Sequence, residues 1–167
     1  HEDHIGAIAH LWPKLQCKIF ATPFTALLIK EKFKEKNIDI TKYLKVVELN
    51  GIIKLDPFTI EYITLTHSIL EPNGLKIDTP AGVILHTGDW KVDPNPLIGG
   101  KINSDRLKEI GDKGVLAMIC DSTNVFSEGR SGSELDVRKN MLTIVRRLKK
   151  RIIITSFASN VARMETA

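Results

Sequence analysis

The sequence predicts a layered α/β domain. Short segments rich in β-branched and apolar residues recur along the chain, and longer segments of helical period lie between them. Turns containing glycine or proline separate the two kinds of segment. Strands in succession with helices interspersed are typical of a layered α/β domain rather than of a helical bundle or a β-sandwich. With 167 residues, 43% of them hydrophobic, the chain is long enough to bury a core.

Two proline-containing segments near the N-terminus predict helices. Residues 5–15 form a helix that is expected to end near Pro13, because proline lacks the backbone N–H of a helical hydrogen bond. A short strand follows over 18–21. The helix predicted over 22–36 opens on a Thr-Pro pair, which supplies an N-cap and a first helical residue.

The middle of the chain predicts two hairpins and a strand between them. Segments 44–49 and 52–55 flank an Asn-Gly pair, which tolerates positive φ at both turn positions and therefore predicts a hairpin. The strand over 58–65 leads to a Thr-His pair. Strands over 74–79 and 82–86 form the second predicted hairpin, which leads to a Thr-Gly-Asp sequence.

The last third predicts helices and strands in alternation. Ser131 and Glu134 have the spacing of a capping box, in which two side chains satisfy backbone donors at a helix start. The predicted elements are a helix over 104–110, a buried strand over 115–120, a helix opening at Glu134, a strand over 151–155 and a helix from Ser156 to Ala167.

The charge and cysteine content permit several partners and favour one compartment. The net charge of +4 allows a nucleic-acid partner without requiring one. The basic run over 146–151 is interpreted first as the solvated end of a helix and second as an RNA-backbone contact. Cys17 and Cys120 are expected to be buried thiols of a cytoplasmic protein. No apolar run reaches the roughly 20 residues that span a bilayer, so we expect no membrane partner.

Five side chains of metal-binding type lie beside predicted strand ends or a helix start. Imidazole and carboxylate groups are ligands for Zn or Mn, and a pair of ions needs a bridging carboxylate. From spacing alone, helix capping or a satisfied core position is an equally good interpretation. The five residues are His1, Asp3, His4, His67 and Asp89.

The two other histidines are interpreted as structural. His10 lies on a predicted helix beside two large apolar residues, and His86 ends an apolar strand. His86 lies close enough in sequence to Asp89 to support a site from behind its ligands.

Five ordered stretches resemble one superfamily and together cover essentially the whole chain. HEDHIG resembles the second motif of the metallo-β-lactamase superfamily, H-x-H-x-D-H, entered at its second histidine. THSILEPNG and LHTGDWKVDP resemble its third and fourth motifs. DSTNVFSEGRSGSE and IIITSFASNVARM are similar to the ribonuclease J branch of the β-CASP nucleases within this superfamily.

The resemblance implies a four-layered αββα sandwich with an inserted β-CASP domain. Residues 1–133 would then be a metallo-β-lactamase domain that is incomplete at its N-terminus, and residues 134–167 the truncated beginning of the β-CASP domain. We therefore expect a fragment that lacks the first histidine of the motif and a late histidine, so that each ion loses one ligand. As a fragment it is expected to be inactive or impaired.

The resemblance also implies residue roles. His1 and His67 would bind one divalent ion, Asp3 and His4 the other, and Asp89 would bridge the two. Zn is the expected metal, with Mn or Mg as alternatives. Asp3 and Asp89 would be the catalytic residues, Asp3 in proton transfer and Asp89 in fixing the distance between the ions.

The implied activity is the hydrolysis of RNA, both internally and from a 5′-monophosphate end in the 5′-to-3′ direction, in RNA maturation and decay. Ser156 and Ser159 would lie near the RNA channel, although either could instead cap the last helix. The complete parent is expected to form homo-oligomers. The alternatives are a small-molecule metallo-hydrolase of the same superfamily and a non-catalytic remnant that binds RNA or a partner chain.

Overall fold

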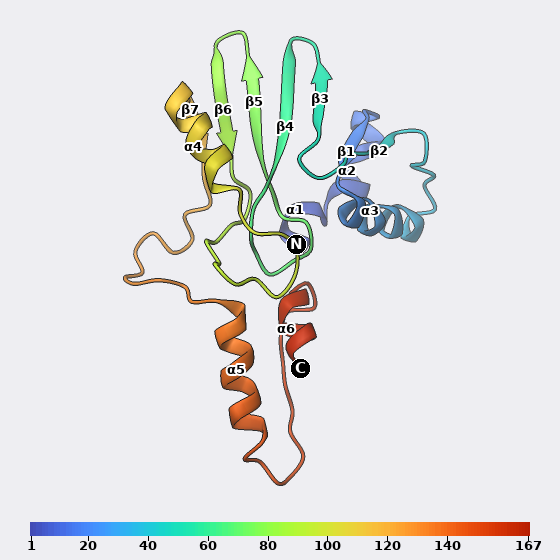
Figure 1. Cartoon of the computed structure of the whole chain (residues 1–167). Helices are drawn as coiled ribbons and strands as arrows, with labels where there is room; N and C mark the ends of the chain where they lie inside the picture. The colour runs from blue at the N-terminus through green and yellow to red at the C-terminus, as the bar shows by residue number, and fades with distance from the viewer.

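A layered body and a helical arm make up the chain, which the computed structural model describes over residues 1–167 (Figure 1). The body holds two sheets and four helices. We use the term arm for residues 134–167, which contain α5 (Glu134–Val145), α6 (Val161–Thr166) and the segment between them. The arm projects from the end of the body where the chain begins (Figure 1).

The N-terminal elements form a small two-stranded sheet with helices packed beside it. β1 (Ile19–Ala21) and β2 (Leu44–Val46) pair in parallel, and α3 (Pro23–Glu35), which packs with α2 (Ile8–Leu15), connects them. The short α1 (Glu2–Ile5) precedes these elements. The only sizeable buried cluster of apolar side chains lies here, and its members are Ala9, Ala21, Ala26, Ile29, Phe33, Ile40 and Leu44.

A five-stranded sheet forms the centre of the body, in the order β3-β4-β5-β6-β7. Neighbouring strands are antiparallel except for β6 and β7, which are parallel. β4 and β6 both pair antiparallel with β5, so they run in the same direction and end at the same edge. The strand bounds are Ile52–Leu55 (β3), Phe58–Thr64 (β4), Asn73–Thr79 (β5), Gly82–His86 (β6) and Ala117–Ile119 (β7).

Two neighbouring residues of β4 show the order of the layers. Glu61 pairs with Arg106 of α4 (Ser104–Lys113), with 2.6 Å between its Oε2 and Nη2 of Arg106. The hydroxyl of Tyr62 donates to the Phe20 carbonyl of β1 at 3.3 Å. Successive side chains of a strand point to opposite faces, so α4 and the β1–β2 layer cover opposite faces of the sheet. The expected αββα order of layers is therefore present.

Most of the predicted elements are confirmed. The helix predicted over 22–36 is α3, the strand over 58–65 is β4, and the hairpin over 74–86 is β5 and β6. The helix predicted over 104–110 begins at Ser104, where Asn103 caps it, and extends to Lys113, just before Gly114 at φ +94°.

The predicted hairpin over 44–55 is wrong. The first segment is β2, which pairs with β1, whereas the second is β3, which pairs with β4 in the other sheet. Asn50 does adopt positive φ, at +58°, but its Oδ1 accepts from the Thr64 backbone N–H at 3.0 Å. The Asn-Gly turn therefore passes the chain from one sheet to the other.

The strand predicted over 151–155 is also wrong. These residues are exposed and have no strand beside them, so their backbone finds no ladder partner. Pro13 does not end its helix, which reaches Leu15 and ends where Gln16 adopts a left-handed conformation at φ +46°. The start of α5 is capped by Ser133, whose Oγ accepts from the Leu135 N–H at 3.1 Å, and not by Ser131 as predicted.

Burial differs from the expectation at two further places. The strand predicted as buried is β7, an edge strand whose Met118 is 62% exposed. Cys17 is exposed at the surface turn that follows α2, and Cys120 is half-buried, so neither thiol is a core residue. Every helix is too short or too polar to span a lipid bilayer.

Candidate metal centre

The five sequence-predicted metal ligands come from three places that meet at one edge of the central sheet. His1, Asp3 and His4 are at the start of the chain, in and beside α1. His67 follows β4 and Asp89 follows β6, and both strands end at this edge. Because β4 and β6 run in the same direction, the loops that follow them meet at this edge, although His67 and Asp89 are 22 positions apart in the sequence.

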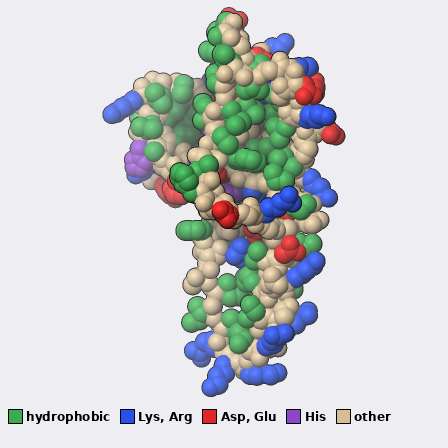
Figure 2. All heavy atoms as spheres, turned by 90° about the vertical axis from the view of Figure 1, so that its left-hand side faces the viewer, with side chains coloured by type: hydrophobic (Ala, Val, Ile, Leu, Met, Phe, Trp, Pro, Cys, Tyr) green, Lys and Arg blue, Asp and Glu red, His purple; other side chains and the backbone are tan.

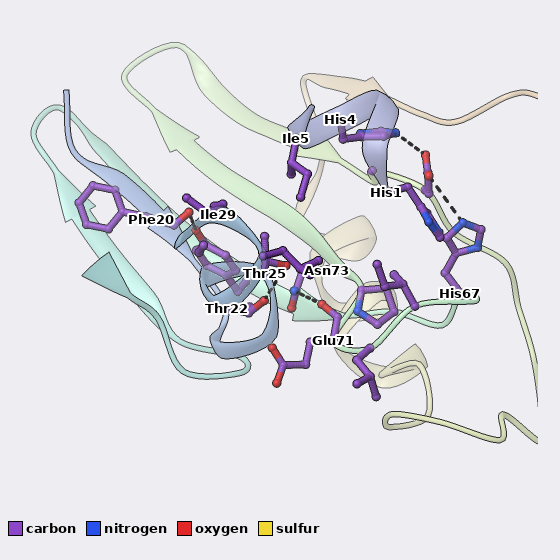
Figure 3. Close-up of a pocket in the computed structure, with 18 of the residues that line it drawn as sticks. His1, His4, Ile5, Phe20, Thr22, Thr25, Ile29, His67, Glu71 and Asn73 are labelled. Carbon is purple, nitrogen blue, oxygen red and sulfur yellow. Dashed lines mark hydrogen bonds and ion pairs between the residues drawn. The ribbon is translucent and has the colours of Figure 1, made fainter. Parts of the chain in front are cut away.

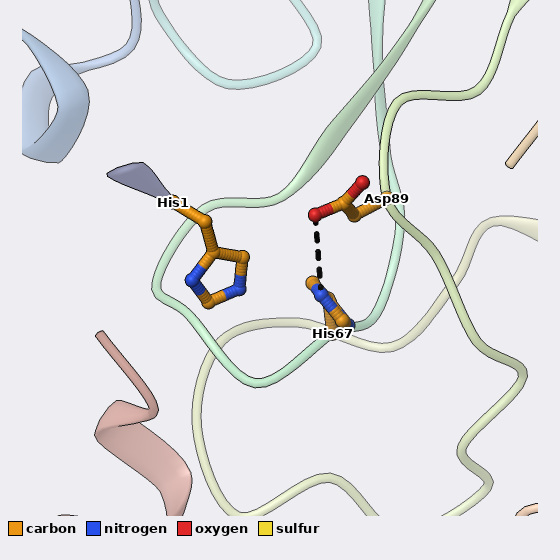
Figure 4. A group of neighbouring side chains, drawn as sticks. All are labelled: His1, His67 and Asp89. Carbon is orange, nitrogen blue, oxygen red and sulfur yellow. Dashed lines mark ion pairs between the residues drawn. The ribbon is translucent and has the colours of Figure 1, made fainter. Parts of the chain in front are cut away.

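Asp89 is the residue that both groups of histidines share. Its Oδ1 lies 3.0 Å from Nε2 of His4, and its Oδ2 lies 3.6 Å from Nε2 of His67 (Figure 4). Two sets of three side chains place their ligand atoms within 4.8 Å of one another: His1, His67 and Asp89, and Asp3, His4 and Asp89. The structure therefore groups the side chains in the same two sets that the sequence resemblance implies.

The donor set fits divalent transition metals. Imidazole nitrogen with carboxylate oxygen is a usual ligand combination for Zn, and one carboxylate with its two oxygens turned to two groups has the arrangement of a bridge. Burial lowers the pKa of His67, so its imidazole stays neutral, as a metal ligand must be. The Nδ1 atom of His67 is buried and has no hydrogen-bond partner.

Hydrogen bonds hold two of the candidate ligands, directly at His1 and through the turn that carries Asp89. Nδ1 of His1 lies 2.7 Å from the Ser159 hydroxyl of the arm, and Nε2 of His1 lies 3.3 Å from the Ser68 hydroxyl. The Gly88 N–H donates to Nδ1 of His86 at 3.1 Å, while Gly88 itself takes positive φ, at +59°. His86 therefore supports the turn that carries Asp89, whereas His10 is exposed and takes no part.

A buried cluster of charges beside the site was not predicted from the sequence. Glu134, 7% exposed, accepts from Nζ of Lys91 at 2.8 Å and lies 3.4 Å from Nη2 of Arg163. Asp93, 1% exposed, accepts from the Glu134 N–H at 2.9 Å. The cluster fastens the arm to the loop after β6. No sequence signal could have found it, because its partners lie about 40 and 30 positions apart and follow no period.

The two serines predicted near an RNA channel lie in different surroundings. Ser156 is exposed and makes no hydrogen bond through its side chain, whereas Ser159 is half-buried against His1. Neither caps the last helix, because Asn160 does so with its Oδ1.

Two cavities adjoin the five residues. One of about 350 Å³ lies between the sheets and is lined mainly by apolar side chains such as Phe20 and Ile29 of the β1–α3 layer, with His1, His4 and His67 at its other end (Figure 3). The other, of about 620 Å³, is lined by polar and charged residues apart from Phe157 and lies between the candidate metal centre and the arm. We call it the polar cavity.

Comparison with known proteins identifies relatives along the whole chain. This chain is 40% identical over 168 residues to ribonuclease J of Sinorhizobium meliloti, and the match covers 99% of this chain and 29% of that protein. Ribonuclease J of Corynebacterium glutamicum is 43% identical over 170 residues, covering 100% of this chain and 23% of that protein. Ribonuclease J of Thermus thermophilus is 33% identical, covering 99% and 30%.

Structural comparison supports the fold. A crystal structure of a protein of unknown function from Enterococcus faecalis V583 matches with a TM-score of 0.64 and 16% identity, over 89% of this chain and 38% of that one. No family model matches the chain. Over its whole length the chain is therefore related to ribonuclease J, and it corresponds to less than a third of each relative named above.

Proposed function

We propose that the chain is the metal-binding part of a metal-dependent ribonuclease of the ribonuclease J type, a hydrolase of RNA phosphodiester bonds. The observation that carries the proposal is the shared position of Asp89 between two sets of histidine and carboxylate ligands. Relatives that carry the ribonuclease J name along the entire chain support the substrate class.

The proposed centre holds two divalent ions. Zn is the first choice, because the imidazoles of His1 and His67 and the carboxylate of Asp89 form one of the two ligand sets. Mn or Mg are the alternatives. Such a pair of ions lowers the pKa of water and stabilises the attacking and leaving oxygens of a phosphodiester. His1 and His67 would hold one ion, Asp3 and His4 the other, and Asp89 both.

The chain's own residues have further proposed roles. Asp3 is the proposed proton acceptor, because its carboxylate is 75% exposed and lies 3.5 Å from Nε2 of His4. Ser156 is a proposed RNA contact, because its hydroxyl is free and exposed. Ser159 lines the polar cavity and is proposed to contact RNA there.

The proposal extends to domain organisation and setting. Residues 1–133 are assigned to a metallo-β-lactamase domain and 134–167 to the beginning of a β-CASP domain, whose first element would be α5. Exonuclease and endonuclease action in mRNA decay and rRNA processing, a cytoplasmic location and homo-oligomers of the complete protein are part of the same proposal.

Metal content is the first test. The purified 167-residue chain and its Asp89→Ala variant are analysed for bound metal by elemental analysis, and Asp112→Ala serves as a control because Asp112 is an exposed residue of α4. We expect metal in the wild type and the control and its loss in Asp89→Ala. Absence of metal from all three proteins would support the non-catalytic alternative.

Cleavage is the second test, because metal binding alone is shared with small-molecule hydrolases of the same fold. Chain loaded with metal is incubated with 5′-monophosphorylated RNA and, separately, with a lactone and a thioester. Cleavage of RNA alone supports the ribonuclease; turnover of a small ester without RNA cleavage would replace it with the small-molecule alternative.

A further inference from the structure

The lining of the polar cavity includes one hydrophobic residue, and its side chain has no packing role within the chain. Phe157 is the only hydrophobic residue among those that line this cavity, and it is 83% exposed. A phenylalanine normally removes most of its ring from water. Nothing in the chain covers this ring, although it adjoins the same cavity as His67 and Asp89.

The surroundings of Phe157 offer polar groups for a ligand with a flat face and a polar edge. Asn160 uses its Oδ1 to cap α6, and its side-chain N–H groups make no hydrogen bond within the chain. Lys91 and Ser68 line the same space, with the Lys91 amine also donating to Glu134 and the Ser68 hydroxyl 3.3 Å from Nε2 of His1. A nucleobase matches this combination, because every base has a stacking face and hydrogen-bonding edges.

The chain that leads to Phe157 favours a single-stranded nucleic acid over a neutral aromatic ligand. Residues 151–156 are exposed and extended, and they follow the basic run over 146–151, none of whose cations forms an ion pair. Figure 2 shows these Lys and Arg side chains gathered at the lower end of the arm. Phosphates bind such cations without regard to sequence, and bases then stack on aromatic rings nearby.

We propose that Phe157 is a stacking platform for one base of single-stranded RNA and holds the neighbouring phosphodiester at the candidate metal centre. This inference deepens the proposed function and rests on it. Phe157 is a binding residue here, and its removal weakens binding about tenfold to a hundredfold, which is the usual effect of losing one stacked base.

The test compares four forms of the 167-residue chain in binding to a short fluorescent single-stranded RNA, measured by anisotropy. Phe157→Ala is expected to weaken binding by that factor, and Phe157→Trp to restore it. Phe126→Ala is the matched control, because Phe126 is 98% exposed and lines neither cavity described above. A second RNA with abasic positions should bind the wild type weakly and should lose nothing further in Phe157→Ala.

Each result separates this inference from the proposed function. Equal binding by wild type and Phe157→Ala, or equal losses in Phe157→Ala and Phe126→Ala, overturns the stacking role. If the wild type still cleaves RNA in that case, the proposed function stands alone. Metal in the protein with no RNA binding by the wild type overturns both.

Discussion

Ser159 connects the arm to the candidate metal centre through one hydrogen bond. Its hydroxyl lies 2.7 Å from Nδ1 of His1, a distance that fits donation by the ring N–H to the hydroxyl. A ligand histidine is commonly held in this way through the nitrogen that does not bind metal, which fixes the orientation of the ring. The serine is therefore placed to set the orientation of His1, the first candidate ligand, from a position 158 residues further along the chain.

Replacing this serine tests the arrangement. Ser159→Ala is expected to lower the affinity for Zn²⁺ by about 10–100-fold, the usual cost of losing a partner behind a ligand, without changing the number of ions bound. Isothermal titration with Zn²⁺ measures the effect, and Ser156→Ala, at an exposed position, should bind as the wild type does. Unchanged affinity in Ser159→Ala would mean that His1 needs no such support.

At this scale the sequence was informative about the candidate ligands and about one support, His86, but not about the buried charges beside them. His67 and Asp89 stood out because each follows a recognisable strand, and the resemblance to the metallo-β-lactamase motifs then implied that they are ligands. Glu134 was predicted only as part of a capping box, yet its carboxylate binds Lys91 and Arg163. Pairings between residues so far apart depend on the tertiary fold, which leaves no period in the sequence.

Among the elements, α5 is fixed to the body by charge rather than by apolar packing. Burial raises the pKa of Glu134, but the hydrogen bond and charge of Lys91 together with Arg163 lower it further, so the net effect is a pKa below 4.5. The unfolded chain therefore takes up this proton at a higher pH than the folded chain does. The stabilisation is complete above pH 4.5 and is lost as the pH falls through the lower folded pKa.

Glu134→Gln should remove this dependence. The variant leaves Arg163 without its Glu134 partner and Lys91 with only Asp93, 3.6 Å away, and is expected to lose about 1–3 kcal/mol of unfolding free energy at neutral pH, with a shallower decline in acid. Urea denaturation at several pH values measures both quantities. Glu165→Gln is the control, because Glu165 lies on the same arm and is 56% exposed. Similar losses in the two variants would count against a fastening role for the buried cluster.

The basic run at the end of α5 belongs to the same arm and is open to solvent. Its cations follow the last helical residue, Val145, and form no ion pairs, so they are free for a phosphate backbone. Exchanging Lys149, Lys150 and Arg151 for glutamine should lower the slope of log affinity for single-stranded RNA against log salt by about 0.7 for each phosphate that is no longer neutralised, or about 2 for three phosphates. Anisotropy over a salt series measures the slope.

The control uses three exposed lysines away from the arm. Lys30, Lys34 and Lys36 lie on or beside α3, and their joint exchange for glutamine removes the same charge. An equal change of slope in both triple variants would assign the effect to net charge and not to the arm.

The wrong pairing over 44–55 and the wrong strand over 151–155 have a common cause at this scale. The hairpin over 44–55 was wrong and so was the strand over 151–155, although both have the right composition. A strand exists only through its partner, and composition does not say which partner is near. Helices such as α3 were predicted well because their hydrogen bonds are local.

The whole molecule presents far more surface than a compact domain of its mass. Its accessible surface is 11542 Å², whereas about 8,300 Å² is expected for a folded monomer of 18.7 kDa. Only 21 of 167 residues are buried, and large apolar side chains stay in water on β7 and on the arm. The excess lies where an edge strand and an extended arm have no neighbours (Figure 1).

This surface predicts that the 167-residue chain associates with itself. Met118 on β7 is 62% exposed and Ile153 on the arm is 84% exposed, and a β-branched segment with free backbone groups is a template for strand pairing between molecules. We expect the sedimentation coefficient to rise with protein concentration and the fluorescence of the dye ANS to increase on binding. Ile153→Lys should reduce both effects, because it places a charge in the exposed segment, whereas Val125→Lys, in a loop outside both regions, should reduce neither. A chain that stays monomeric at every concentration and leaves ANS fluorescence unchanged would show that its exposed apolar residues are too scattered to act as one surface.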